Sequence, residues 1–145
     1  MNYTVLKESD IPQIVPLFVG YYNNCEDTGW TAELAYKRIH QVVTREDAYG
    51  LVLWNNGKPA GFAMGFFEQY EDGQAYDLVE IVVAKEYQGK GVGTAFMEEL
   101  EHRAKEKGAL LVQLDSVNDE MHRHFYAKLG YRDSGNLIKK SKFFG

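Results

Sequence analysis

A glycine-rich turn between an apolar strand and an amphipathic helix constrains this chain more than any other feature. Residues 76–84 favour a strand whose last part, 81–84, is continuously apolar, as expected if both faces are buried. Three alternating glycines follow within residues 88–94, and the next segment carries a stripe of apolar side chains and ends at Gly108. At the start of a helix, free backbone N–H groups and the helix dipole attract anions. The pattern therefore favours a phosphate site over a plain turn.

Two familiar phosphate motifs do not fit this turn. A Walker A loop requires Ser or Thr directly after its lysine, but Lys90 is followed by Gly91. A dinucleotide-binding fingerprint would require glycine at position 94 or 96, where the chain has Thr94 and Phe96. The turn is therefore expected to hold a phosphate in another way.

The remaining segments predict an α+β layered domain. The order of expected elements is β-α-α-β-β-β followed by α-β-α-β-β, with Asn56 and Gly57 forming a hairpin turn. Pro16 is expected to bend or restart the first helix, and the last two strands are expected near residues 131–132 and 137–144. An antiparallel run followed by a β-α-β crossover indicates a mixed, mostly antiparallel sheet of about six to seven strands with about four flanking helices.

Length and composition limit the classes of protein that fit. The 145 residues suit one domain, with no internal boundary between residues 1 and 145. The net charge of -5 argues against broad nucleic-acid binding, which needs a basic surface. Cys25 is the single cysteine, which favours a reducing compartment. No apolar run is long enough for a membrane span, and residues 1–10 do not resemble a secretory signal, so a cytoplasmic location is expected.

The charge is unevenly distributed between the two halves. Residues 1–72 contain 5 Lys+Arg and 10 Asp+Glu, whereas residues 73–145 contain 11 of each, so the whole excess of -5 is N-terminal. A solvated acidic surface explains this excess, and so does a site for a positively charged ligand in the N-terminal half. Both interpretations remain open.

The turn and the segments around it resemble the GNAT superfamily of acyl-CoA-dependent N-acetyltransferases. Gln88, Gly91 and Gly93 match the family pattern [RQ]-x-x-G-x-[GA], and residues 125–131 resemble its second C-terminal signature. The order of elements fits nearly the whole chain, while the motif-level resemblance covers residues 76–131. One departure is the lysine at position 85, where the family often has proline.

The resemblance implies binding of acetyl-CoA as cosubstrate, with no metal ion. The backbone of the turn would hold the pyrophosphate, the main chain near Val82 and Val83 would pair with pantetheine, and Asn118 would reach the pantetheine arm. From residue type alone, Asn118 is also a candidate helix N-cap. The implied cofactor-binding residues are Val82, Val83, Gln88, Gly89, Lys90, Gly91, Val92, Gly93, Thr94 and Asn118.

The resemblance also implies acetyl transfer to an amine by direct attack on the thioester. Tyr126 matches the family position of the general acid, and Glu80 is the candidate acceptor of the amine's proton. From the residues alone, Tyr126 could equally be a core aromatic, and Glu80 an ion-paired strand residue.

The expected acceptor is a primary amine on a small, cationic molecule. The alternatives are a protein N-terminus or lysine, and a CoA-binding module without turnover. The sequence leaves a homodimer open.

Overall fold

The computed structural model describes all residues from 1 to 145, in two compact units. We call residues 1–115 the sheet unit and residues 116–145 the C-terminal unit, and each is described by itself. The elements of the sheet unit are β1 (Asn2–Val5), the 3-10 turn η1 (Glu8–Asp10), α1 (Ile11–Cys25), α2 (Ala32–Val43), β2 (Ala48–Asn55), β3 (Lys58–Tyr70), β4 (Gly73–Val83), the 3-10 turn η2 (Lys85–Tyr87), α3 (Val92–Glu106) and β5 (Ala109–Leu114). The C-terminal unit contains α4 (Glu120–Lys128).

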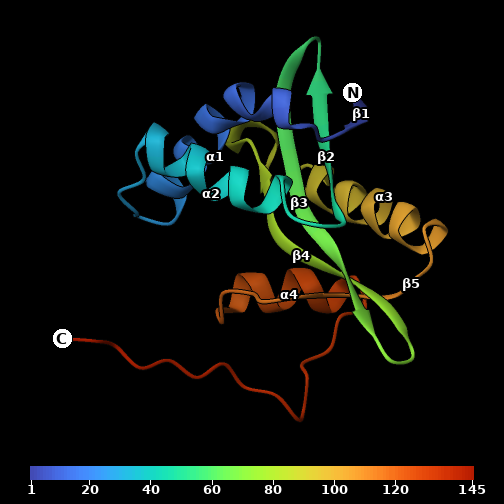
Figure 1. Ribbon diagram of the computed structural model, residues 1–145. Helices are drawn as coiled ribbons and strands as arrows, with labels where there is room; N and C mark the ends of the chain where they lie inside the picture. The colour runs from blue at the N-terminus through green and yellow to red at the C-terminus, as the bar shows by residue number, and fades with distance from the viewer. The chain divides into compact units, whose positions relative to one another are not determined.

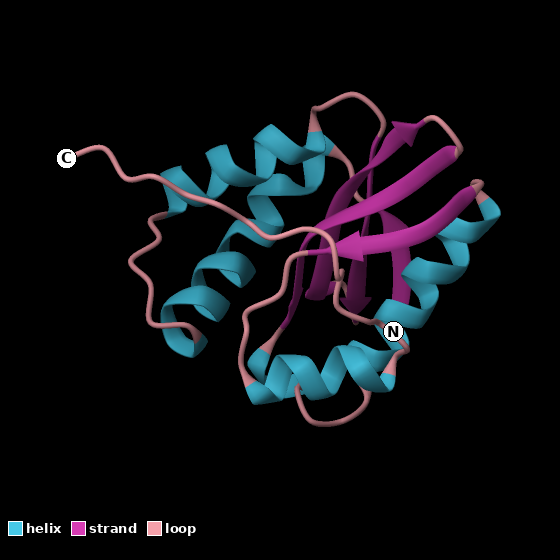
Figure 2. Ribbon diagram, turned by 90° about the horizontal axis from the view of Figure 1, so that it is seen from below, coloured by secondary structure: helices cyan, strands magenta, loops and turns pink.

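The five strands form one sheet in the order β1-β2-β3-β4-β5. The first four strands pair with one another in antiparallel fashion, while β5 follows the crossover helix α3 and is parallel to β4. In Figure 1, α1 and α2 lie on one side of the sheet and α3 lies on the other, and Figure 2 shows helices on both sides of the strands. The expected α+β class and mixed sheet are therefore confirmed.

The expected number of strands is wrong, because the sheet has five strands rather than six or seven. The expected strands near 131–132 and 137–144 are absent, and residues 129–145 contain no helix or strand. The large apolar side chains within 137–144 face solvent, with Phe143 and Phe144 being 90% and 93% exposed. Apolar and β-branched residues favour a strand only where a partner strand and a buried face are available. In this structure the segment has neither.

Local signals explain the first helices and the first hairpin. Thr31 caps α2, because its side chain accepts a hydrogen bond from the backbone N–H of Leu34. Asn56 and Gly57 both have positive φ angles, of 52° and 79°, as the hairpin turn requires. Pro16 does not restart α1, which runs through it as one helix whose buried residues lie on both sides of the proline.

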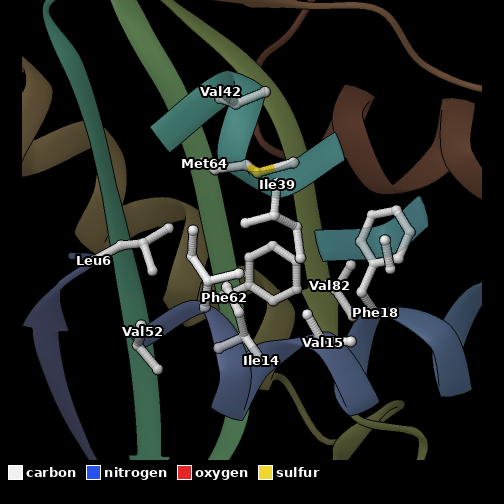
Figure 3. Close-up of a cluster of buried hydrophobic side chains, with 12 residues drawn as sticks. Leu6, Ile14, Val15, Phe18, Ile39, Val42, Val52, Phe62, Met64 and Val82 are labelled. Atoms are coloured by element: carbon white, nitrogen blue, oxygen red, sulfur yellow. The ribbon is translucent and has the colours of Figure 1, made fainter. Parts of the chain in front are cut away.

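The main core lies between the sheet and helices α1 and α2 (Figure 3). It is built from the apolar face of each helix and from side chains of β2, β3 and β4 that point toward them. Its fully buried members include Ile14, Phe18, Ile39, Val52, Phe62 and Val82. This packing fixes α1 and α2 over the middle of the sheet.

We expect Phe62→Ala to destabilise the protein by about 3–5 kcal/mol, because it leaves a cavity in the core. The matched control is Phe144→Ala, which makes the same change at an exposed position and should alter the free energy of unfolding by less than about 0.5 kcal/mol. Urea denaturation followed by tryptophan fluorescence measures both. Equal effects of the two substitutions would contradict the assignment of this core.

Candidate active site

The glycine turn joins the end of β4 to the start of α3. Gly89 and Gly91 both have left-handed backbones, with φ angles of 72° and 79°, and Gly91 is the N-cap of α3. A β-carbon at either glycine would meet no atom within 4 Å, so these positions favour glycine for the backbone conformation and not for space. No side chain caps the helix, so its first N–H groups remain available. The turn is therefore suited to an anion, and its role toward CoA stays a prediction.

A register shift lies in the last part of β4, the strand that leads to this turn. Met64 of β3 pairs with Glu80, whereas the next residue, Gly65, pairs with Leu78, so Val79 is an additional residue on β4. An extra residue of this kind bends the strand and increases its twist. The pairing of β4 with β5 runs from Gln74 to Leu78 and stops where the shift occurs. The strand β5 itself ends at Leu114, so β4 continues beyond this point without a partner on that edge.

Beyond the shift, β4 is paired with β3 on one edge, and no strand pairs with residues 79–83 on the other. The backbone N–H of Ala84 donates to Ala60 on β3, so the alternation of a strand turns the N–H and C=O of Val83 toward the open edge. There the Val83 carbonyl accepts a hydrogen bond from the Gln88 side chain, at 3.0 Å. An open edge of this kind can pair with an extended ligand that contains amides.

Glu80 lies on this same part of β4, with its side chain on the side of α1 and α2. Its Oε1 accepts a hydrogen bond from Nη2 of Arg38 at 3.2 Å, and its Oε2 accepts one from the Tyr22 hydroxyl. The Glu80 side chain is 14% exposed and that of Arg38 is 39% exposed. Burial, followed by the neighbouring Glu80 charge, raises the pKa of Tyr22 well above its ordinary value, so Tyr22 stays a protonated donor.

The contacts of Tyr22 and Arg38 were missed by the sequence reasoning. Arg38 lies three residues after Ala35 and four before Val42, which are both buried, so it occupies the edge of the helix face that packs on the sheet. A cation at such a position needs an anionic partner. That spacing is the signal that could have identified Arg38, although it does not name Glu80 as the partner.

Asp77, the other carboxylate of β4, has a different environment. It accepts a hydrogen bond from Gln113 of β5 at 2.6 Å, where β4 and β5 are still paired. Burial, and then a hydrogen bond with Glu68, raise the pKa of Asp77 to about 6. Asp77 is therefore held within the paired part of the sheet, away from the open edge.

Asn118 and Tyr126 belong to the C-terminal unit. The N-cap of α4 is Asp119, whose side chain accepts from the backbone N–H of His122 at 2.8 Å, so Asn118 is not the cap. Instead, Asn118 accepts a hydrogen bond from Arg123. The Tyr126 ring makes edge-to-face contacts with two aromatic neighbours, Phe125 and Tyr131. Their predicted roles toward CoA and the thiolate remain predictions.

Three further observations concern metal ions, the single cysteine and membranes. No group of three or more His, Cys, Asp or Glu side chains is arranged to hold a metal ion. Cys25 is exposed at the end of α1. None of the helices combines the length and the apolar character that crossing a bilayer would require.

The structure thus combines a mixed sheet, whose parallel pairing ends at Leu78, with a glycine turn that joins the unpaired end of β4 to α3. The sequence matches the Acetyltransferase (GNAT) family over residues 11–131, and the chain belongs to that family. The resemblance inferred from the motifs is thus confirmed.

An uncharacterized N-acetyltransferase of Methanocaldococcus jannaschii is 30% identical over 139 residues, which cover 91% of this chain and 62% of the relative. The chain thus spans less than two thirds of that relative's length.

Solved structures share the fold at low sequence identity. A ribosomal-protein-alanine N-acetyltransferase from Brucella melitensis biovar Abortus 2308 superposes with a TM-score of 0.76 and 18% identity, covering 99% of this chain and 100% of that one. An aminoglycoside N-acetyltransferase in complex with CoA superposes with a TM-score of 0.76 and 14% identity, covering 97% of this chain and 93% of that one. At these identities the likeness shows the fold alone.

Proposed function

We propose that this protein transfers the acetyl group of acetyl-CoA to a primary amine of a small, cationic molecule. The observation that carries the proposal is the placement of an anion-binding turn, residues 88–94, beside an unpaired stretch of β4. CoA contains a pyrophosphate and an extended chain with amides. The pyrophosphate would bind at the turn, and the amide chain would pair with the unpaired stretch of β4. The aminoglycoside acetyltransferase with the same fold supports a small amine as acceptor.

The binding roles follow from the chemistry of the groups. The backbone N–H groups from Gln88 to Thr94 would hold the pyrophosphate, with Lys90 adding a positive charge. Of the two residues predicted to pair with pantetheine, Val83 directs its main chain to the open edge, whereas the Val82 carbonyl lies close to Gly61 of β3. We therefore assign the edge contact to Val83, with Val82 fixing the strand through the core. Asn118 would contact the pantetheine arm.

Two residues are assigned to proton transfer. Bound acetyl-CoA supplies a thioester, and the acceptor amine must be neutral to attack its carbonyl carbon. Glu80 would receive the amine's proton, directly or through water, because a carboxylate has about four acceptor positions and Arg38 and Tyr22 use two of them. As the C–N bond forms and the C–S bond breaks, Tyr126 would donate a proton to the departing sulfur. That transfer is uphill by only about 1.5 pKa units at reference values.

A protein N-terminus is the second candidate acceptor. The ribosomal-protein-alanine acetyltransferase of the same fold favours it. The excess of acidic residues in the N-terminal half suits a cationic amine in either case. An acceptor screen that follows the release of free CoA thiol from acetyl-CoA tests the proposal, and a protein that binds CoA without releasing thiol would contradict it.

We expect Gly91→Glu to weaken CoA binding by roughly 10- to 100-fold, because a carboxylate would stand where the pyrophosphate is bound. Isothermal titration calorimetry measures this affinity. The matched control is Gly57→Glu in the β2–β3 hairpin, since Gly57 has the same φ of 79° and equally open surroundings. The control carries the same backbone strain and should bind CoA normally. Undiminished affinity in a folded Gly91→Glu protein would remove the pyrophosphate from this turn.

Tyr126→Phe keeps the ring and deletes only the hydroxyl. We expect kcat to fall by about 10²- to 10⁴-fold while CoA affinity is unchanged, as for the loss of a general acid. Tyr131→Phe is the control, because it makes the same change in a ring that contacts Tyr126. If the two variants turn over at the same rate, Tyr126 is an aromatic packing residue and not the acid.

Glu80→Gln tests the assigned proton acceptor. The kcat/KM of the wild-type protein should rise with pH, because the neutral fraction of the amine increases, and the variant should show a lower and flatter rise. Asp77→Asn is the control on the same strand. Since the pKa of Asp77 is about 6, its loss can alter the profile only near that pH. A Glu80→Gln profile that coincides with that of the wild type would assign the proton to solvent.

A further inference from the structure

Arg38 has a position that stability alone does not explain. It lies on the edge of the α2 face that packs on the sheet, and its guanidinium reaches Glu80 across 42 residues of sequence. The adjacent Lys37 is exposed and points to solvent. A partly exposed ion pair such as Arg38–Glu80 adds little to folding stability. The pair is, however, located at the open part of β4, where the proposed function places the reacting amine.

The guanidinium has unused binding capacity. Its hydrogen bond to Glu80 involves Nη2 alone, at 3.2 Å, whereas a guanidinium carries about five N–H donors in a planar fork. With 39% of the Arg38 side chain exposed, the remaining donors can be reached from solvent. Such a fork is well suited to a carboxylate, which it can bind through two parallel hydrogen bonds.

Glu80, the partner of Arg38, is negatively charged and held in position. Glu80 is held on its second oxygen by Tyr22, whose hydroxyl remains protonated, so the carboxylate cannot easily turn away from Arg38. A cation and an anion are thus presented side by side, with no net charge. A ligand whose own charges are adjacent and opposite would match both groups, whereas a second ammonium group would be repelled by the guanidinium.

We propose that the acceptor is a free α-amino acid, whose amine faces Glu80 and whose carboxylate is bound by Arg38. The proposal rests on the proposed acetyl transfer to a small primary amine, and it replaces the cationic acceptor by a zwitterion that carries a carboxylate beside its ammonium group. An α-amino acid carries its amine and carboxylate on one carbon, which suits two groups in direct contact. A diamine has no carboxylate for the fork, and the N-terminus of a peptide has lost its carboxylate to the amide bond. Arg38 is thereby the residue that selects the acceptor.

The test compares the twenty common α-amino acids with their α-amides, which keep the amine and the side chain but lack the negative charge; because the amide also lowers the pKa of the amine, each variant is compared with the wild type on the same compound. In the thiol-release assay we expect the wild-type protein to prefer at least one amino acid over its amide. Arg38→Gln should lower kcat/KM for that amino acid by roughly 10- to 100-fold, mainly through KM, and leave the amide nearly unchanged. Arg38→Lys should restore part of the loss, because an ammonium supplies the charge without the fork. Lys37→Gln removes the same charge one residue away and should have no effect.

Two results would overturn the proposal. One is a wild-type protein that acetylates amides, diamines or peptides as well as it acetylates amino acids. The other is an Arg38→Gln variant whose kcat/KM falls by the same factor for an amino acid and for its amide. Calorimetry of the amino acids and amides with the CoA-loaded protein separates this question from the proposed function. Binding of an amino acid but not of its amide, dependent on Arg38, would support the inference even if no thiol were released. Absence of such binding in the wild-type protein would refute it.

Discussion

The one-residue register shift at Val79 is the constraint on which the rest of the site depends. Up to Leu78, β4 is hydrogen-bonded on both edges, and beyond the shift it is bonded to β3 alone. Main-chain groups left without partners are costly when they are buried, so the open edge must be satisfied by water, a side chain or a ligand. Gln88 satisfies the Val83 carbonyl in this structure. The residue that opens the family motif is therefore also a local substitute for a neighbouring strand.

The core and the site share the same strand. Val82 is fully buried in the cluster that packs α1 and α2 on the sheet, and Glu80, two residues earlier, points to the same side. Because the helices are fixed by that cluster, the positions of Tyr22 and Arg38 relative to Glu80 are fixed as well. The apolar packing thus supports a charged pair that contributes little stability of its own.

Local features of the fold could be predicted from the sequence, and contacts over long sequence distances could not. The hairpin at Asn56 and the turn at Gly91 have residue-level causes, namely the positive φ angles that few residues adopt. The link from Tyr22 to Glu80 spans 58 residues, and no local pattern specifies which helix position will reach which strand position. The register shift at Val79 could not be predicted either, because valine is as suitable for a regular strand as for an irregular one.

The strands expected after residue 130 fail for a related reason. An apolar, β-prone segment does not by itself specify a strand, because a strand forms only with a partner strand. The candidate site was predicted only in part, because some of its residues depend on contacts between distant segments. Its backbone component follows from glycines in sequence, and the motif resemblance supplied Glu80, but Arg38 required the packed helices to bring it there.

The alternation of a β-strand separates the two substrates in the proposed reaction. Along the open stretch of β4, main-chain groups point sideways in the plane of the sheet, while the side chains of residues such as Glu80 stand perpendicular to it, toward α1 and α2. A ligand paired with the edge therefore lies in the plane of the sheet, and a ligand bound by Glu80 and Arg38 approaches from the side of the helices. The two directions meet along the short stretch of β4 from Glu80 to Val83. An acyl group carried along the edge and an amine arriving from the helices can thus come together without competing for the same contacts, which is the arrangement that direct transfer between two bound substrates needs.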